Sequence, residues 1–241
     1  MVVAILTDVH GNLPALKAAL ECIDELGCDV IFHTGDVIGI GPYPAECLDL
    51  LLNRPNTRLL MGNHDAWFAF GLPWPRPDWM SEGEAAHHEW VRAQINSALR
   101  AVVGRWPYLI REEIEGVRVT FLHYGLDPSG ADFQPIVPRP SSADLDALFD
   151  GLATNLVFYG HHHLASDIRG RARYVNPGSL GCCPEPVARF ATLECQDGTY
   201  SVRQHAVRYD PSDLFTAFEA RAVPERAFIR QTFFPAESPL H

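Results

Sequence analysis

The segment VVAILTDVHGN, from Val2 to Asn12, decides the fold. Its first five residues, Val2 to Leu6, form an unbroken apolar run, which is typical of a strand covered on both faces in a parallel sheet. Beyond the turn, apolar residues recur every three or four positions as far as Leu26, and Gly27 then provides a helix end. The start of the chain therefore predicts a strand, a polar turn and a crossover helix.

The same alternation continues along the chain. We expect further strands over residues 30–32 and 58–61, separated by a helix over residues 44–52. The second half predicts a helix over residues 145–152 and strands over residues 117–123, 156–159, 173–176, 188–194 and 200–207. Strands that alternate with helices indicate an α/β fold built on a parallel sheet.

Residues 67–79 differ from the rest because they are rich in tryptophan, phenylalanine and proline, and we expect an irregular loop there. Ser81 followed by Glu84 forms a capping box, so a helix is predicted over residues 82–101, with His87 and His88 on its solvated face. From Tyr209 onward, a short helix should lead into a peripheral tail that contains proline.

Composition excludes several classes of function. The 19 basic and 30 acidic residues give a formal net charge of −11, which disfavours charge-driven binding to long nucleic acids or anionic membranes. The N-terminal apolar run is too short for a signal peptide or a membrane span. The six cysteines form no CxxC pair, so neither a disulfide framework nor a thiolate zinc site is expected, and the default location is a reducing cytoplasm.

Polar motifs follow the predicted strands, each at a carboxyl end. In chain order they are Asp8-Val9-His10, Gly35-Asp36, Gly62-Asn63-His64-Asp65, His123 and Gly160-His161-His162-His163. In open α/β sheets the ligand site lies off the carboxyl ends of the strands, so these segments should converge. Carboxylate oxygens and imidazole nitrogens together bind divalent metals such as Mn, Fe, Co, Ni and Zn.

The combination of motifs is more specific than any one of them. Asp-x-His and His-x-His arise by chance in a chain of this composition, but Gly-Asn-His-Asp has a chance count of only ~0.002. In their order, the motifs resemble those of the calcineurin-like metallophosphoesterases. The segments DVHGNLPAL (8–16), GIGPYP (39–44) and NPGS (176–179) are similar to the small bacterial and archaeal members, and the resemblance extends from Val2 to about Val207.

This resemblance implies a four-layer αββα sandwich, in which helices flank two mixed β-sheets. It also implies a metallophosphoesterase domain over residues 1–207, with the aromatic loop and helix of residues 66–106 inserted near the site and residues 208–241 as a C-terminal extension. His162 departs from the family, which usually has Thr or Ser at that position. Tyr124 stands where a small residue is commoner, which would narrow that side of the site.

The resemblance assigns two metal ions to the strand-end residues. One ion would be held by Asp8, His10, Asp36 and His163, and the second by Asp36, Asn63, His123 and His161, with Asp36 as the bridge. The cofactors would be two divalent metal ions, with manganese favoured over iron, zinc, cobalt and nickel. Together they would hold a bridging hydroxide that attacks phosphorus.

The same resemblance gives roles to the neighbouring residues. His64 would act as general acid or as an electrostatic stabiliser, and Asp65 would orient and charge His64. Trp67, Arg76 and Tyr124 are the residues expected to contact the substrate.

We therefore expect a divalent-metal-dependent hydrolase of small phosphoesters, either a phosphodiesterase or a phosphatase. A dinucleoside polyphosphate hydrolase, a protein phosphatase and a catalytically silent binding scaffold of the same fold are the alternatives. The motifs define the reaction centre and not the pocket walls, so they do not separate these substrates, and the sequence does not determine the oligomeric state. Two divalent ions would change the net charge from −11 to about −7, which leaves an acidic body that favours small phosphoesters over long polyanions.

Overall fold

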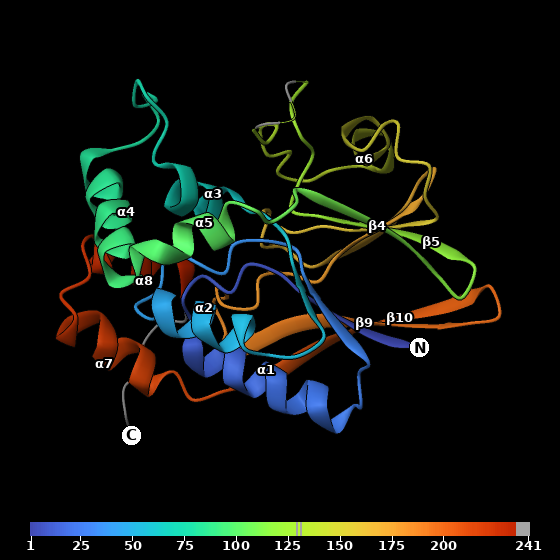
Figure 1. The fold of residues 1–241 in the computed structure, drawn as a ribbon, viewed down its shortest axis with the longest axis horizontal. Coiled ribbons are helices and arrows are strands. Elements are labelled where there is room, and N and C mark those ends of the chain that lie inside the picture. Colours follow the sequence, from blue (N-terminus) through green and yellow to red (C-terminus); the bar gives the residue numbers. More distant parts are fainter. Residues whose placement is uncertain (129, 131, 235–241) are drawn as a thin grey trace.

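The computed structural model describes residues 1–128, 130 and 132–234. Two five-stranded β-sheets pack face to face, and helices cover the outer face of each (Figure 1). The fold is therefore the αββα sandwich that the sequence resemblance implied. Residues 235–241, the end of the expected C-terminal extension, lie outside the described residues.

The first sheet is built around the segment that opens the chain. β1 (Val2–Leu6) is its central strand, and the strand order is β10-β9-β1-β2-β3. β2 (Val30–His33) and β3 (Thr57–Leu59) run parallel to β1, whereas β9 (Val187–Gln196) and β10 (Thr199–Arg208) form an antiparallel hairpin on its other side. Two crossover helices, α1 (Leu13–Glu25) and α2 (Pro44–Leu52), join the parallel strands, so the carboxyl ends of these strands meet at one edge.

The second sheet has the strand order β4-β5-β6-β8-β7. Its strands are β4 (Leu109–Ile114), β5 (Val117–Leu122), β6 (Leu156–Phe158), β7 (Ser166–Arg169) and β8 (Arg173–Asn176). The three inner strands are parallel to one another, and the edge strands β4 and β7 are antiparallel to their neighbours. α6 (Ser142–Leu148) packs Leu145 and Leu148 on the outer face. The sequence predicted the inner strands but not the two edge strands.

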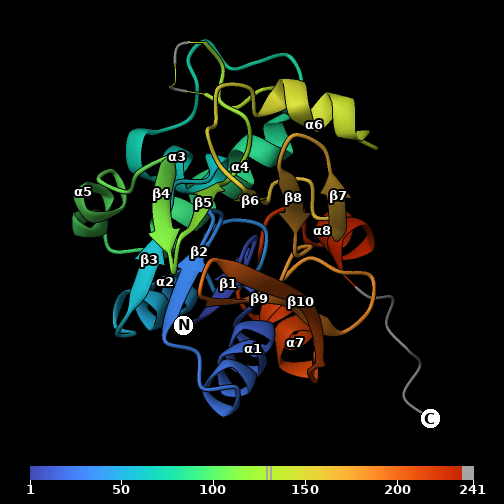
Figure 2. The ribbon, with the colours of Figure 1, turned by 90° about the vertical axis from the view of Figure 1, so that its right-hand side faces the viewer.

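The two sheets are held together by a core of apolar and aromatic side chains. Phe32 of β2 stacks on Phe121 of β5, with ring centroids 3.9 Å apart and an interplanar angle of 7°. Val3 and Ile5 of β1 are fully buried in the same cluster as Phe158 of β6. Because this core joins the parallel strands of both sheets, it fixes the relative positions of their carboxyl ends (Figure 2).

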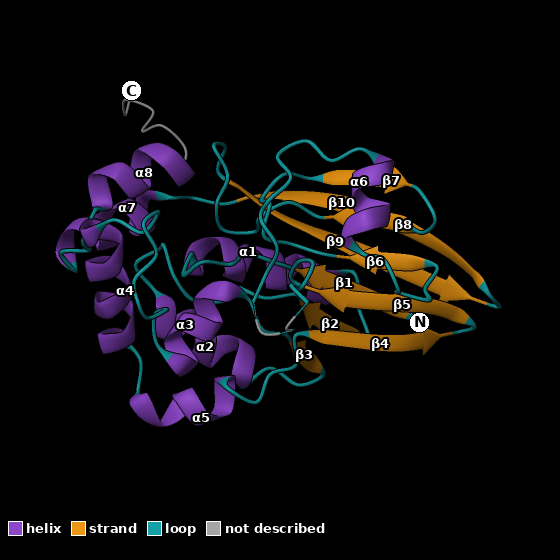
Figure 3. Ribbon diagram, turned by 90° about the horizontal axis from the view of Figure 1, so that it is seen from above, coloured by secondary structure: helices purple, strands orange, loops and turns teal. Residues whose placement is uncertain are grey.

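Most of the helices gather beyond those carboxyl ends (Figure 3). They are α3 (Asn63–Phe70), α4 (Glu82–Gln94), α5 (Arg100–Val103), α7 (Ser212–Ala220) and α8 (Arg226–Phe233). The loops that follow the strands are therefore enclosed between the sheets and a layer of helices.

Three sequence expectations in this region are wrong. Residues 67–70 form the second half of α3, so the irregular segment begins only after Phe70. The helix expected over residues 82–101 ends at Gln94, because Ile95 has an extended backbone with ψ of 138°, and α5 follows as a separate helix. The tail is not peripheral, since Phe218 and Ile229 are buried in one cluster with Ile40.

Among the described residues, none of the helices combines the length and the apolar character needed to cross a membrane. All six cysteines are free thiols.

Candidate metal centre

The residues assigned to metal binding all stand in loops that directly follow strands. Asp8 and His10 follow β1, Asp36 follows β2, and Asn63 begins α3 after β3. In the second sheet, His123 follows β5, whereas His161 and His163 follow β6. The structure brings all seven side chains together between the carboxyl ends of the two sheets, as the sequence predicted.

The backbone at five of these residues has a conformation that residues other than glycine rarely adopt. Positive φ angles occur at Asp8 (53°), His10 (47°), Asp36 (62°), His161 (64°) and His163 (59°). Each such residue is in the sparsely populated left-handed region, and clusters of this kind are a property of functional sites. The loops turn sharply after each strand, and the turns direct two carboxylates and three imidazoles into one space.

One group of side chains contains Asp8, His10 and His163. The Nε2 atoms of His10 and His163 are 2.9 Å apart, and the Asp8 Oδ1 atom lies 3.7 Å from the first and 3.5 Å from the second. Asp36 Oδ2 lies 3.7 Å from His10 Nε2. Four side chains of two types, aspartate and histidine, thus face the same point.

A second group surrounds His123. Its Nε2 atom lies 3.3 Å from Asp36 Oδ2, 3.2 Å from Asn63 Oδ1 and 3.2 Å from His161 Nδ1. Asp36 Oδ2 therefore belongs to both groups, which is the position that the sequence resemblance gave to a bridging ligand.

The electrostatics of both groups follow from burial and from the charges packed beside each group. Although burial alone would raise the pKa of Asp8, its interactions with His163 and His123 hold that pKa below the usual 3.8. Burial lowers the pKa of His10 to about 4 and the pKa of His161 to about 3, so both rings are neutral near pH 7.

His123 is shifted in the opposite direction. Burial would lower its pKa, but the adjacent Asp36 carboxylate outweighs burial and raises the pKa to about 9. Near pH 7 the His123 ring is therefore protonated, so a cation bound there would have to displace its proton, whereas His10 and His161 are already neutral.

The donor set fits divalent metal ions. The Nε2 atoms of His10 and His163 are 2.9 Å apart, and both lie within 4 Å of the buried Asp8 carboxylate. Together these atoms carry more lone pairs than the neighbouring N–H and O–H donors of the protein can satisfy. Histidine, aspartate and asparagine side chains are ligands for borderline divalent metals. Groups of ligand atoms within 4.8 Å of one another include His10 with Asp36 and His64, and Asp36 with His123 and His161.

Two glycines make room for this arrangement. A Cβ atom at Gly62 would collide with the Asp36 side chain and backbone, and a Cβ atom at Gly160 would collide with the Thr7 hydroxyl. Thr7 donates a hydrogen bond of 2.9 Å to Asp8 Oδ2, and the His161 amide donates one of 3.1 Å to the same oxygen. The absence of side chains at these two positions allows the loops to close over the carboxylates.

Asp65 does not play the part that the sequence resemblance assigned to it. Its Oδ2 atom accepts hydrogen bonds from the amides of Asp36 (2.7 Å) and Gly62 (3.1 Å), and its Oδ1 atom accepts one from Ile38 (3.2 Å). Both oxygens are thus used by the backbone of the loops after β2 and β3. The expectation that Asp65 orients His64 is corrected: Asp65 ties the Asp36 loop to the start of α3.

His64 is packed among rings instead. Its amide donates a 2.9 Å hydrogen bond to Asp36 Oδ1, and its ring lies 4.9 Å from His10 and 4.8 Å from Trp67, measured between centroids. Its Nδ1 atom is buried and has no hydrogen-bond partner among the described residues. Burial lowers the pKa of His64 well below 6.5. The ring is therefore neutral and placed at the edge of the first group of ligands.

His87 and His88 are buried, which contradicts the solvated face expected for them. Both are 4% exposed, and His88 lies 5.1 Å from the His64 ring. Burial lowers the pKa of His87 to about 4 and that of His88 to about 3. The sequence analysis placed both histidines on a solvated face of the helix, but α3 and α8 cover that face of α4.

The three expected substrate contacts have different positions. Trp67 packs against His64 and, at 6.1 Å between centroids, against Trp79. Arg76 pairs with Glu82 at 3.6 Å on the surface. Tyr124 is only 1% exposed and packs on the His161 ring at 5.0 Å, so it supports a ligand and is not accessible to a substrate. Of the three, Trp67 is the one next to His64.

Sequence reasoning missed two features of the site. Phe233 of α8 lies 6.3 Å from the His163 ring, and the apolar spacing of Ile229 and Phe233 was the available indication of a packed helix there. Cys182 is buried, and its sulfur lies within 4.8 Å of nitrogens of His10 and His163. No motif marked it, because it approaches the site from a loop distant in sequence.

Comparisons with known proteins agree with this geometry. The family model described as a calcineurin-like phosphoesterase superfamily domain matches residues 1–198. An uncharacterised protein of Methanocaldococcus jannaschii is 25% identical over 240 residues, covering 92% of this chain and 94% of that protein.

Solved structures with similar folds cover nearly the whole chain. A hypothetical protein from Pyrococcus horikoshii is 22% identical with a TM-score of 0.82, covering 98% of this chain and 99% of its own. A metallophosphoesterase from Sphaerobacter thermophilus is 24% identical with a TM-score of 0.74, covering 95% and 96%. At these identities the two structures support the fold.

Removing the Asp65 carboxylate should destabilise the whole protein. Asp65→Leu leaves three buried amides without acceptors, so we expect the free energy of unfolding to fall by about 3 kcal/mol or more, and by less in Asp65→Asn, which keeps one acceptor oxygen. Urea denaturation of the metal-free proteins measures this, with the exposed Asp78→Asn as the control. An unchanged denaturation midpoint in Asp65→Leu would contradict the role of Asp65 as a brace.

His87 should make stability fall with acid. Its pKa in the folded protein is about 4 against 6.5 for the free side chain, so the folded state resists protonation. Its effect on stability is absent above pH 6.5 and grows as the pH falls toward 4, to a loss of up to about 3 kcal/mol for the difference of about 2.5 pH units. We expect His87→Gln and His87→Phe both to flatten the pH dependence of urea denaturation in this window. Wild-type slopes in both variants would show that His87 is accessible to protons.

Proposed function

The chain belongs to the calcineurin-like phosphoesterase superfamily, and on this premise we propose that it is a divalent-metal-dependent hydrolase of small phosphoesters, acting as a phosphodiesterase or phosphatase. The observation that carries the proposal is the pair of ligand groups that share Asp36 Oδ2. A shared carboxylate is how proteins hold two cations close enough to act on one phosphoryl group.

We assign the ligands of two metal ions on this basis. Asp8, His10, Asp36 and His163 would hold one ion, and Asp36, Asn63, His123 and His161 the other. When bound, two divalent ions supply a coordinated water of lowered pKa and neutralise charge on the phosphoryl oxygens. The backbone hydrogen bonds of Asp8 and Asp36 keep each carboxylate in one orientation before any ion arrives.

His64 is the residue that we assign to the leaving-group side. It adjoins the first ligand group through His10 and Asp36, but it is not needed to complete either ligand set. Close packing against Trp67 and the tight approach of its ring to Gly39 hold it in one position. A neutral imidazole fixed in this way can donate a hydrogen bond to the departing oxygen, and it would act as general acid only after taking up a proton.

The presence of His64 together with the complete ligand set favours an enzyme over a silent scaffold of the same fold. A scaffold needs the sandwich but has no requirement for a histidine beside the metal ligands. Positive φ angles at Asp8, His10, Asp36, His161 and His163 support metal binding at this site.

The metal and the compartment follow from the side-chain chemistry. Oxygen and imidazole ligands accept manganese, iron, cobalt, nickel or zinc, and manganese is the metal that we propose to test first. Six free thiols are consistent with a reducing cytoplasm. The net charge of −11 favours small phosphoesters over long nucleic acids as substrates.

Hydrolysis should depend on added metal and on His64. With Mn²⁺, we expect turnover of p-nitrophenyl phosphate or of its bis ester, and a loss of about 100-fold or more in kcat for His64→Ala with metal content unchanged. Release of nitrophenolate and elemental analysis measure the two quantities. Folded protein that hydrolyses neither ester with any divalent metal would rule out the enzyme, and wild-type turnover in His64→Ala on an ester with a poor leaving group would rule out the role of His64.

Asp36→Asn should empty both metal sites together. The neutral amide removes the charge that both ligand groups share, so we expect bound metal to fall from about two ions per chain to well under one. His161→Ala, which affects one group only, is the matched variant and should retain about one ion. Loss of a single ion in Asp36→Asn, measured by elemental analysis after gel filtration, would show that Asp36 is not a bridge.

A further inference from the structure

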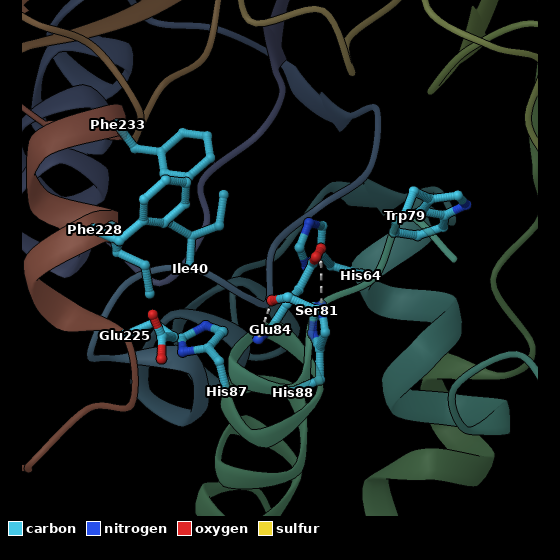
Figure 4. Close-up of a pocket in the computed structure, with 11 residues that line it drawn as sticks. Ile40, His64, Trp79, Ser81, Glu84, His87, His88, Glu225, Phe228 and Phe233 are labelled. Atoms are coloured by element: carbon cyan, nitrogen blue, oxygen red, sulfur yellow. Dashed lines mark hydrogen bonds and ion pairs between the residues drawn. The ribbon is translucent and has the colours of Figure 1, made fainter. Parts of the chain in front are cut away.

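A cavity of about 570 Å³ lies beside the metal centre, and His64 forms part of its wall (Figure 4). It is bounded by α4, α8 and the irregular segment that precedes α4. Figure 4 shows Phe228 and Phe233 on α8 at one side, with Trp79 at the other side. The cavity has the size of a small-molecule site and opens onto the residue placed nearest the leaving group.

The wall formed by α8 is a fixed part of the fold. Ile229 and Phe234 are buried in one cluster with Ile40, which itself lies in the loop after Asp36. Arg226 and Arg230 both pair with Glu219 of α7, at 2.7 and 3.1 Å. A Cβ atom at Gly83 of α4 would collide with the Glu225 side chain, so the two helices approach as closely as a glycine allows.

The lining combines aromatic rings with a few polar groups. His87 faces the cavity from α4 while only 4% exposed. Neither ring nitrogen has a well-formed hydrogen bond among the described residues, and the nearby backbone of Pro224 offers only a weak one. A buried imidazole with so weak a partner keeps hydrogen-bonding capacity for a ligand. Phe228 and Trp79 remain 60% and 62% exposed, so their faces are available for contact.

The charge of the lining separates the possible occupants. Glu84 and Glu225 contribute carboxyl groups, and the described lining residues include no lysine or arginine. A leaving group that carries phosphate or carboxylate would meet like charge here without a compensating cation. A flat, uncharged group would gain ring contacts and could hydrogen-bond with His87.

We propose that this cavity binds the leaving group of the substrate and selects esters whose leaving group is a neutral aromatic or heteroaromatic alcohol. The inference rests on the proposed phosphoester hydrolysis and adds its substrate class. It places dinucleoside polyphosphates, whose leaving group is itself a polyanion, outside the preferred substrates. Phe228, Trp79 and His87 become specificity residues that do not touch the metal ligands.

Non-hydrolysable phosphonates test the cavity apart from turnover. Methylphosphonate reports binding of the head group to the Mn²⁺-loaded protein, benzylphosphonate adds a neutral ring, and 4-sulfobenzylphosphonate adds an anion to that ring. We expect benzylphosphonate to bind about tenfold more tightly than methylphosphonate by calorimetry, and the sulfonated compound to lose most of this gain.

Variants on opposite walls identify the binding site. Phe228→Ala and Trp79→Ala should each reduce the tenfold ratio of the two affinities to about twofold. Phe70→Ala is the matched control, because Phe70 is 66% exposed on α3 and does not line the cavity, and it should keep the tenfold ratio. The two variants lie on separate elements, so a local folding defect in one of them would not explain the same loss in both.

The outcomes distinguish this inference from the proposed function. Equal affinities for methylphosphonate and benzylphosphonate, or an unchanged ratio in both wall variants, would overturn the cavity's role while head-group binding and ester hydrolysis stand. Tighter binding of the sulfonated compound would overturn the preference for neutral groups. Failure of the metal-loaded protein to bind any phosphonate or to hydrolyse p-nitrophenyl esters would overturn the proposed function and this inference with it.

Discussion

The constraint on which the rest of the structure depends is the burial of two carboxylates, Asp8 and Asp36, at the meeting point of the two sheets. An isolated buried charge is among the most costly features that a fold can contain. Here each carboxylate is surrounded by imidazoles and backbone amides. The carboxylate oxygens and imidazole nitrogens have more lone pairs than there are donors nearby, and this makes the site suitable for cations. Three features fix the positions of these two side chains. They are the geometry of the loops, the glycines where the loops approach closely, and the hydrogen bonds of Asp65 to the backbone.

The strands supply the rigidity that this arrangement needs. Left-handed residues cost of order 1 kcal/mol or more each and persist only when their surroundings leave no alternative. Asp8 comes two residues beyond β1 and Asp36 three residues beyond β2, and the apolar side chains of these strands are held in the core by contacts such as the stack of Phe32 on Phe121. Hydrogen bonds between the loops, such as the amide of Asp8 to the carbonyl of Gly35 at 3.0 Å, join neighbouring turns. The strain is therefore supported by the same sheet packing that brings the strand ends together.

The sequence predicted two kinds of feature. One is an element set by its local residue pattern, and the other is a position set by the rule that parallel strands of a sheet end at the same edge. The apolar run of Val2 to Leu6 and the helical spacing after it predict β1 and α1, and the rule that parallel strands end at one edge brings Asp8 and Asp36 together beyond β1 and β2. Contacts between distant segments follow no such rule. Asp65 has the spacing of a partner for His64, but its oxygens are captured by amides of a loop almost 30 residues earlier. His87 and His88 look solvated in a polar helix until α8, some 140 residues later, covers them.

α8 lies outside the residues that the family model matches. Residues 1–198 contain every residue assigned to metal binding, and His64. α8 reaches that centre from outside the match, through Phe233 beside His163 and through Ile229 against the loop that carries Ile40. Because Ile40 is four residues from Asp36, the packing of α8 and the position of a carboxylate are mechanically connected. α8 thus contributes a wall beside the candidate site, and in this kind of fold substrate selection depends on the residues that line the pocket.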